Sequence, residues 1–338
     1  MHLLFTGGSG YIGSNTALEF LKNTSCQISI LDNLSTGFIE NFEYLQNQFN
    51  NRVHLIKADL SDIKTLEDLF INHHFDCVLH FGASLIVSES VSNPLLYYSN
   101  NTVNTTQLIT MCLKYKIKKF IFSSTAAVYG EPDARLIPVN ESAPLAPINP
   151  YGASKMMSER ILEDTSKAYD FNYVALRYFN VAGSNIQDKS SLGVLGQRSK
   201  NATHLIKVAC EYALGKRKNI SIFGDDYPTK DGTCIRDYIH ITDLANAHLQ
   251  AYTYLQKYKK SEVFNVGYSQ GYSVKEVIEM VKKISGIDFR VEISARRAGD
   301  PAVLISDNKK IMSLTDWIPR YNDLATIIKS AYEWEKKL

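Results

Sequence analysis

The sequence predicts an α/β protein with a doubly wound parallel sheet and a smaller C-terminal α/β domain. Short apolar runs alternate with longer segments of helical period through the first half of the chain, as they do in strand–helix–strand units. A glycine cluster directly follows the first run and precedes the first helical segment. At 338 residues the chain also exceeds the usual size of one hydrophobic core, so a second, smaller domain is expected.

Six apolar runs in the first half have the length and composition of buried strands. They lie at residues 3–6, 28–32, 53–58, 77–81, 120–123 and 172–178. The pattern between them predicts helices at residues 12–22, 66–72, 94–116 and 151–169. Asn149 and Pro150 precede the last of these helices, where an asparagine cap and a proline in the first turn are favoured. Together these elements predict a domain over residues 1–180.

The composition of the chain changes after Val181. Residues 183–201 are rich in Ser, Asn, Gly, Asp and Lys and show no strong period, which predicts a long loop. Helices are expected at 202–214, 242–258, 274–285 and after Asp323, and strands at 220–223, 263–266 and 289–293. We expect residues 181–338 to form the smaller domain, with segments near 233–262 returning to the first.

The glycine cluster reads TGGSGYIG at residues 6–13. Two spacings overlap in it, G-x-G-x-x-G and G-x-x-G-x-x-G. Glycines permit a tight turn and a close approach of the backbone to a pyrophosphate, while the N–H groups and the dipole at a helix start favour phosphates. Its place between a strand and a helix predicts a Rossmann-type dinucleotide site. The alternative is a turn that only needs flexible glycines.

Asp32 indicates which dinucleotide to expect. It ends the second predicted strand, close to the ~20 residues after the last glycine at which an acid accepts hydrogen bonds from the adenosine ribose. That carboxylate would repel a 2′-phosphate and no arginine replaces it, so NAD is favoured over NADP. Asp59 ends the third predicted strand and is a candidate for contact with adenine, although turn chemistry explains it as well.

Tyr151, Lys155 and Thr125 are the candidate catalytic residues. A spacing of four puts Tyr151 and Lys155 on one helix face, and Thr125 follows a strand at the end where parallel sheets bind ligands. A tyrosine is a poor base at neutral pH, but a nearby ammonium and a nicotinamide cation favour its phenolate. Lys155 would also hydrogen-bond the nicotinamide ribose, and Thr125 would hold the substrate oxygen beside Tyr151.

The Tyr-x-x-x-Lys spacing alone is weak evidence. It recurs at Tyr115, Tyr212 and Tyr332, where ordinary contacts along a helix face explain it. Of the four instances, only the one at Tyr151 follows a proline-started helix that comes after the hydroxyl-bearing segment 123–125. This context, rather than the spacing, predicts redox chemistry there.

Composition argues against several other classes of function. The 37 basic and 35 acidic residues leave a net charge of +2, too balanced for a general nucleic-acid or anionic-membrane surface. Five scattered cysteines form no C-x-x-C pair and the eight histidines show no H-E-x-x-H spacing, so no disulfide framework and no metal site are expected. With no signal-peptide pattern and no apolar run of ~18 residues, we expect a soluble, cytoplasmic protein.

The candidate residues belong to a longer series of motifs. It comprises LDNL at 31–34, HF at 80–81, YY at 97–98, FSS at 122–124, VYG at 128–130, YGASK at 151–155, RYFN at 177–180, DGT at 231–233, RDYIH at 236–240 and RRxGD at 296–300. With these motifs the chain closely resembles the extended short-chain dehydrogenase/reductase family and, more closely still, its UDP-glucose 4-epimerase branch. The resemblance covers essentially the whole chain.

The resemblance implies reversible epimerisation of UDP-glucose and UDP-galactose at C4, through a transient 4-keto sugar and with NAD kept bound between turnovers. Carried over by position, it implies NAD contacts from Gly7, Gly10, Tyr11, Ile12, Gly13, Asp32, Asn33, Ser35, Thr36, Gly37, Asp59, Leu60, Phe81, Gly82, Ala83, Asn100, Ser123, Tyr151, Lys155 and Phe179. It implies a UDP-sugar site formed by Thr125, Tyr178, Asn180, His204, Leu205, Phe223, Arg236, Arg297, Asp300 and Leu304. Two arginines suit a pyrophosphate, an aromatic ring can flank uracil, and an aspartate can accept from ribose hydroxyls.

Three positions depart from the pattern of that branch. Thr125 stands where serine is common and still presents a hydroxyl. Leu85 stands where a lysine that contacts the cofactor is common, which predicts weaker NAD binding. Leu304 stands where glucose-restricted members carry a tyrosine. A smaller residue there implies room for an N-acetyl group, so UDP-GlcNAc and UDP-GalNAc are candidate substrates as well.

Three other functions remain open. Sugar-nucleotide 4,6-dehydratases use an acid pair directly after the threonine, where this chain has Ala126 and Ala127. A UDP-glucuronate decarboxylase is separable by its product, and a catalytically silent NAD sensor would usually lack the tyrosine or the lysine. The resemblance also implies a homodimer joined by the helices near 94–116 and 151–169, both long and amphipathic.

Overall fold

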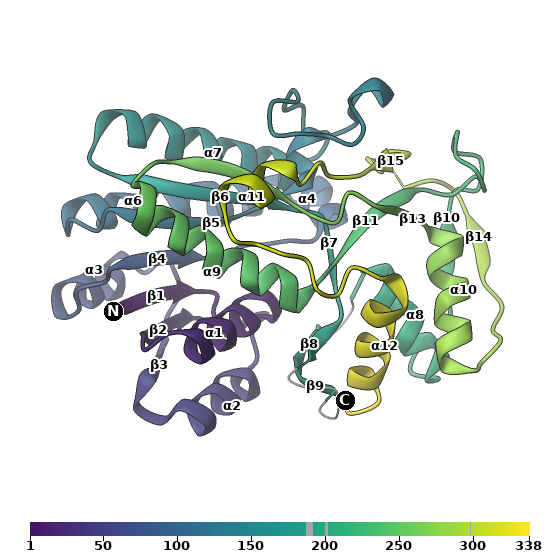
Figure 1. The fold of residues 1–338 in the computed structure, drawn as a ribbon, viewed down its shortest axis with the longest axis horizontal. Coiled ribbons are helices and arrows are strands. Elements are labelled where there is room, and N and C mark those ends of the chain that lie inside the picture. Colours follow the sequence, from purple (N-terminus) through teal and green to yellow (C-terminus); the bar gives the residue numbers. More distant parts are fainter. Residues whose placement is uncertain (187–191, 200–201, 298) are drawn as a thin grey trace.

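The computed structural model describes residues 1–186, 192–199, 202–297 and 299–338. Its largest element is a seven-stranded sheet in the order β12-β6-β5-β4-β1-β2-β3, with every neighbouring pair parallel (Figure 1). The strands are β1 (His2–Thr6), β2 (Gln27–Asp32), β3 (Val53–Lys57), β4 (Cys77–His80), β5 (Lys119–Thr125), β6 (Asn172–Tyr178) and β12 (Glu262–Val266). The predicted doubly wound sheet is therefore confirmed, including the run at 263–266, which supplies an edge strand.

Helices cover both faces of this sheet because its strands alternate their side chains between two layers. Leu3 and Phe5 of β1 join one cluster of buried apolar side chains, and Leu4 joins another. The first layer holds α1 (Tyr11–Asn23), α2 (Ile39–Phe49) and α9 (Ile241–Tyr258). The second holds α3 (Ile63–Asn72), α6 (Asn104–Lys114) and α7 (Pro150–Ala168).

The helix predicted over residues 94–116 changes its pitch part-way. It consists of α5 (Pro94–Tyr97), a π-helical turn (Tyr98–Val103) and α6. In that turn the Asn101 side chain accepts from the backbone N–H of Ser84 at 2.8 Å and donates to its carbonyl oxygen at 3.0 Å. Asn100 donates to Ser84 Oγ at 2.9 Å. The π-helical turn thus holds the loop after β4, and such turns are frequent at functional sites.

A second, four-stranded sheet is built around β11 (Ile235–His240). β11 pairs with β13 (Gly271–Ser273) in antiparallel fashion, and with β15 (Val303–Leu304) and β7 (Asn180–Ala182) in parallel. The sequence pattern did not predict β11, because charged residues interrupt its apolar run. Asp237 is nevertheless buried, accepting backbone hydrogen bonds from Tyr268 at 2.9 Å and Ser269 at 3.0 Å.

Helices α8 (Leu205–Ala213), α10 (Val274–Ser285) and α12 (Leu324–Glu335) share a separate apolar cluster beside this sheet (Figure 1). β10 (Ser221–Phe223) pairs in parallel with β14 (Glu292–Ser294), so the strand predicted at 289–293 begins at Glu292 instead. The short helices α4 (Val87–Ser92) and α11 (Lys309–Leu314) complete the regular helices of the described ranges. None of the helices in those ranges is long and apolar enough to cross a membrane.

The prediction of one long loop at 183–201 is wrong in part. Strands β8 (Ser184–Ile186) and β9 (Leu192–Gly196) pair in antiparallel fashion and pack against α12. Residues 187–191, 200 and 201 of the predicted loop lie outside the described residues. Strands this short cannot display a clear period, so the pairing of their backbones is not visible in the side-chain pattern. The division of the chain at residue 180 stays a prediction.

Candidate active site

The glycine loop lies at the carboxyl end of β1, against the loop that follows β4. Gly7 has a φ of +70°, and a Cβ there would lie 2.6 Å from the backbone nitrogen of Gly82. A Cβ at Gly13, in the first turn of α1, would lie 2.5 Å from the carbonyl oxygen of Gly7. No side chain of the described residues caps α1 and its first turn holds no acid, so the positive end of the helix dipole faces the loop. These features fit a dinucleotide pyrophosphate.

Asp32 ends β2 beside the glycine loop. Its carboxylate accepts backbone hydrogen bonds from Ser9 at 2.9 Å and from Leu34 at 2.8 Å. Burial raises the pKa of Asp32, and the two backbone bonds oppose that rise. A Cβ at Gly37 would lie 2.8 Å from Asp32 Oδ1, so the loop after β2 also passes close to the carboxylate. Because each carboxylate oxygen has a second lone pair, both can still accept from ribose hydroxyls.

Four other predicted cofactor residues, Asn33, Asp59, Leu60 and Gly82, lie on the loops that follow β2, β3 and β4. Asn33 donates to Asp59 Oδ2 at 2.5 Å, and hydrogen bonds from Ser61 hold the pKa of Asp59 below its ordinary value. A Cβ at Gly82 would lie 3.0 Å from Leu60 Cδ1. Asp59 therefore has the hydrogen bonds of a turn residue, and its contact with adenine stays a prediction.

The start of α7 brings Tyr151 to Thr125. Asn149 caps the helix by accepting a hydrogen bond from the backbone N–H of Gly152 at 2.9 Å. A Cβ at Gly152 would lie 2.5 Å from the carbonyl oxygen of Ala127, so the helix packs closely on the 3-10 turn that follows Thr125. The Thr125 side chain lowers the pKa of the Tyr151 phenol, against the larger effect of burial, which raises it. The two candidate residues thus meet, and their catalytic role stays a prediction.

Lys155 is buried one turn further along α7. Its Nζ donates to the carbonyl oxygen of Ser123 at 2.9 Å and lies 4.8 Å from the ring centroid of Phe122. Burial lowers the pKa of Lys155 to about 7, and the Glu159 carboxylate acts against that decrease. Burial also raises the pKa of Tyr151. A further positive charge beside the phenol, such as a nicotinamide ring, would therefore favour the phenolate at neutral pH.

Ser123 and Tyr178 meet across the ends of β5 and β6. Their side-chain oxygens are hydrogen-bonded, and Thr125 is the register partner of Tyr178. Phe179 turns instead into a buried apolar cluster that also contains Leu304. Tyr178 thus lies at the end of the sheet that holds the candidate catalytic residues, whereas Phe179 and Leu304 share an apolar wall.

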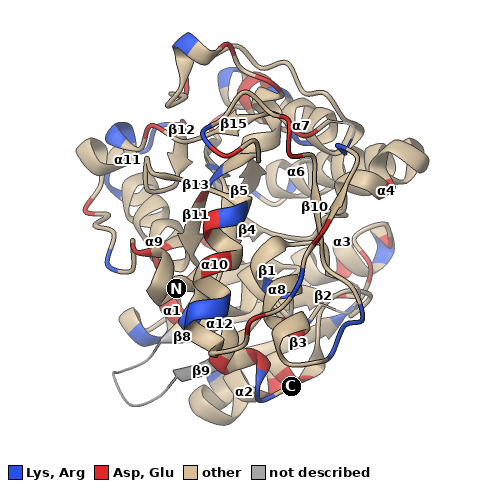
Figure 2. Cartoon of the chain, turned by 90° about the vertical axis from the view of Figure 1, so that its right-hand side faces the viewer, with Lys and Arg blue, Asp and Glu red and all other residues tan. Residues whose placement is uncertain are grey.

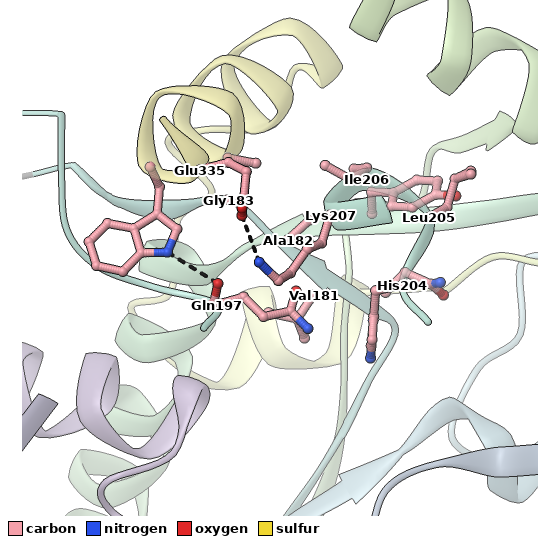
Figure 3. A pocket seen from close by; sticks show the side chains of 13 residues that line it. Val181, Ala182, Gly183, Gln197, His204, Leu205, Ile206, Lys207 and Glu335 are labelled. Atoms are coloured by element: carbon pink, nitrogen blue, oxygen red, sulfur yellow. Dashed lines mark hydrogen bonds and ion pairs between the residues drawn. The ribbon is translucent and has the colours of Figure 1, made fainter. Parts of the chain in front are cut away.

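Three predicted substrate residues line one pocket at the start of α8 (Figure 3). Asn180 comes from β7, and His204 and Leu205 come from the amino end of α8. Burial lowers the pKa of His204, which favours its neutral form. Lys207, also in the wall of the pocket, donates to Glu335 of α12 at 2.6 Å. The lysine charge is thereby compensated, and amide and imidazole groups face the pocket as candidate hydrogen-bonding partners.

The remaining predicted substrate residues lie on or beside β10, β11 and β15. Of these strands, β11 pairs with β7, which carries Asn180. Arg236 of β11 is the register partner of Leu304, and its Nη2 lies 3.6 Å from Asp300 Oδ1. The Arg297 guanidinium lies 3.8 Å from the ring centroid of Phe223, so it covers one face of that ring. Figure 2 shows acidic and basic segments interspersed over this side of the molecule.

Two buried ion pairs of the site were not predicted from the sequence. Glu159 pairs with Arg177 behind the catalytic residues, and Lys207 pairs with Glu335 beside the pocket. A signal existed for Glu159, because it follows Lys155 at the same helical spacing that separates Lys155 from the tyrosine. None existed for Glu335, which lies 128 residues from its partner in the chain.

Comparison with known proteins agrees with the fold and with the geometry of the site. The family described as the NAD dependent epimerase/dehydratase family matches residues 3–267. The chain belongs to this family. One relative, the UDP-glucose 4-epimerase of Halalkalibacterium halodurans, is 43% identical over 100% of this chain and 96% of its own length.

Solved structures agree with this chain in fold over its full length. The UDP-Glc/GlcNAc 4-epimerase from Campylobacter jejuni is 55% identical, with a TM-score of 0.85 and coverage of 100% of this chain and 99% of that one. The UDP-glucose 4-epimerase from Bifidobacterium longum, solved with NAD+ and UDP, is 34% identical, with a TM-score of 0.93 and coverage of 100% and 98%. The Rossmann-type fold and the dependence on NAD, both predicted from the sequence, are confirmed.

Proposed function

We propose that this chain interconverts UDP-glucose and UDP-galactose by inverting C4, which would place it in galactose metabolism. The observation that carries the proposal is the assembly of Thr125, Tyr151 and Lys155 at the carboxyl end of β5, beside a glycine loop and Asp32 that fit NAD. Full-length similarity to proteins named as UDP-glucose 4-epimerases supports it.

Each candidate catalytic residue has a separate role in the reaction. NAD, when bound at the glycine loop, supplies a reversible acceptor for the hydride of C4. The Tyr151 phenolate takes the proton of the 4-hydroxyl and returns one to the 4-keto sugar, while Thr125 holds the same oxygen through its hydroxyl. The Lys155 ammonium favours the phenolate. Inversion requires that the 4-keto sugar present its other face before it is reduced, and net redox change is zero.

The UDP part of the substrate would be held by the second sheet and its neighbours. Arg236 and Arg297 neutralise the pyrophosphate, and Asp300 accepts from the ribose hydroxyls. Phe223 flanks the uracil, which requires Arg297 to leave the face of the ring that it covers. Asn180, His204 and Leu205 contact the ligand from the pocket in Figure 3.

N-acetylated sugars are a second group of proposed substrates. Leu304 is buried in the apolar wall it shares with Phe179, and it is smaller than the tyrosine of glucose-restricted relatives. Similarity to the Campylobacter jejuni protein, named as a UDP-Glc/GlcNAc 4-epimerase, supports this range. No turnover of UDP-GlcNAc at saturating concentration would remove these sugars from the proposal.

A homodimer is proposed through the helices near residues 94–116 and 151–169, together with the adjoining α4. Val91 of α4, Leu95 of α5, Val103 of the π-helical turn and Met157 of α7 are exposed apolar residues on elements that pack together. Such a group of side chains is typical of an interface. Light scattering of the purified chain should give the mass of a dimer, and Leu95→Glu should shift it toward a monomer. A cytoplasmic location stays a prediction, supported by five buried, free cysteines.

A 4,6-dehydratase is the nearest alternative within the family. The positions directly after Thr125 hold Ala126 and Ala127 in a 3-10 turn, and neither side chain can transfer a proton. Incubation with UDP-glucose, UDP-galactose, UDP-GlcNAc and UDP-GalNAc, followed by identification of the products, distinguishes the reactions. An epimerase gives the C4 epimer of each accepted sugar, whereas a released 4-keto-6-deoxy sugar would contradict the proposal.

A further inference from the structure

A buried ion pair lies directly behind the candidate catalytic residues. Glu159 and Arg177 are each 5% exposed. Arg177 donates from Nε to both carboxylate oxygens at 3.1 Å and from Nη2 to Oε2 at 2.6 Å, and Ser124 donates a further hydrogen bond to Glu159. Burying two charges is costly even when they are well paired.

The helix α7 places Glu159 on the face that carries the catalytic pair. Tyr151, Lys155 and Glu159 follow one another at a spacing of four, so their side chains lie along one side of the helix. Lys155 bonds the carbonyl oxygen of Ser123, and Glu159 bonds the hydroxyl of Ser124. Two side chains of α7 therefore hold consecutive residues of β5, immediately before the threonine of the site.

Arg177 extends the same network to the neighbouring strands. Ser124 is the register partner of Arg177, one step before the register pair formed by the catalytic threonine. Arg177 Nη1 donates to Tyr129 OH at 3.0 Å, and Tyr129 OH donates to Asn265 Oδ1 of β12 at 2.7 Å. One buried network thus connects β5, β6 and β12 close to the carboxyl edge where the reaction is proposed.

The charges around Lys155 give Glu159 a second effect. Among the groups around Lys155, Tyr151 and Glu159 belong to the same helix. His80 lies on β4, and Tyr178 and Arg177 lie on β6. Burial lowers the pKa of His80 to about 3, so this ring is neutral. Glu159 is the charged group that raises the pKa of Lys155 against the effect of burial. The carboxylate therefore favours the ammonium form on which the phenolate depends.

We propose that Glu159 is a positioning residue for the reaction, which keeps Lys155 in its ammonium form and fixes Thr125 beside Tyr151 through β5. This inference rests on the proposed function, because it takes the role of Lys155 from it. Loss of the carboxylate should let Lys155 give up its proton at lower pH. The alkaline limb of the pH–rate profile, where Lys155 becomes neutral, then moves to lower pH.

The test is the pH dependence of kcat and KM for UDP-galactose in Glu159→Gln. We expect the alkaline limb of kcat to move down by about one pH unit, a tenfold effect at any pH above it. KM should change little, because the proposed UDP contacts come from other elements. Glu159→Asp keeps the charge and should keep the wild-type limb, even with lower thermal stability.

A double variant separates a folding defect in Glu159→Gln from the proposed effect. Glu159→Gln with Arg177→Gln leaves no unpaired buried charge, and it should still show the downward shift because the carboxylate beside Lys155 is absent. An active variant lacking the carboxylate but showing the wild-type limb overturns the inference, as does an equal shift in Glu159→Asp. A wild-type chain without epimerase activity would instead defeat the proposed function itself.

Discussion

Replacement of Gly13 by alanine should weaken NAD binding and lower the stability of the fold only moderately. The new methyl group would lie 2.5 Å from the carbonyl oxygen of Gly7 and 2.8 Å from the Cα of Gly8. Both are backbone atoms. Gly7 has little space to move away, because a Cβ on Gly7 itself would lie 2.6 Å from the backbone nitrogen of Gly82. Alanine favours a helix over glycine by about 1 kcal/mol, whereas overpacking costs about 1–3 kcal/mol. The free energy of unfolding should therefore fall by up to about 2 kcal/mol.

NAD binding should weaken because the displaced atoms are those that approach the pyrophosphate. Calorimetric titration of the cofactor-free protein should show NAD bound at least about tenfold more weakly, which corresponds to about 1.4 kcal/mol. Gly215→Ala is the matched control: Gly215 has a φ of +71° and an added methyl group would meet nothing within 4 Å, so only backbone strain of about 1–2 kcal/mol is introduced. Wild-type NAD affinity in Gly13→Ala, or an equal loss in Gly215→Ala, would show that the close packing of Gly13 does not shape the cofactor site.

Four further substitutions test the site. Tyr151→Phe should lower kcat by about 10²–10⁴-fold with NAD still bound in calorimetry; near-wild-type turnover would remove Tyr151 from the mechanism. Since Lys155 has a pKa of about 7 when folded and ~10.4 when unfolded, the unfolded chain binds more protons between those values, so the stability of the cofactor-free protein gains from Lys155 as pH rises from 7 to 9. Lys155→Met should flatten that rise in urea unfolding, and an unchanged slope would contradict it. Leu85 is half exposed, so a lysine fits at this position without disturbing the core. Leu85→Lys should tighten NAD binding in the same titration, and weaker NAD binding would contradict this prediction. Leu304→Tyr should reduce kcat/KM for UDP-GlcNAc more than for UDP-glucose, and equal losses would contradict the role of this residue.

The large sheet could be predicted from the sequence because its strands are buried on both faces. Such strands are continuous apolar runs, and the glycine loop marks where the first of them ends. β11 could not be predicted, since Asp237 interrupts its pattern and becomes acceptable in the interior only through hydrogen bonds from Tyr268, Ser269 and Ser306. Those donors come from distant parts of the chain, so no local sequence pattern indicates that they bond Asp237.

The same distinction applies to the site. Tyr151, Lys155 and the helix start at Asn149 are local in sequence, so this helix start, together with the preceding hydroxyl-bearing segment 123–125, was enough to single them out. The contacts of Glu159 with Arg177, and of Phe223 with Arg297, form between separate elements and depend on how those elements pack. Spacing could suggest such residues individually but could not pair them.

In the proposed reaction, the hydride removed from C4 returns to the same carbon while the cofactor stays in place. UDP-galactose carrying deuterium at C4 can be incubated with the protein and an equal concentration of NAD, and the product followed by NMR. We expect many turnovers per NAD and UDP-glucose that keeps the deuterium at C4. Absence of UDP-glucose, loss of the label to solvent, or a halt after one turnover would contradict this mechanism.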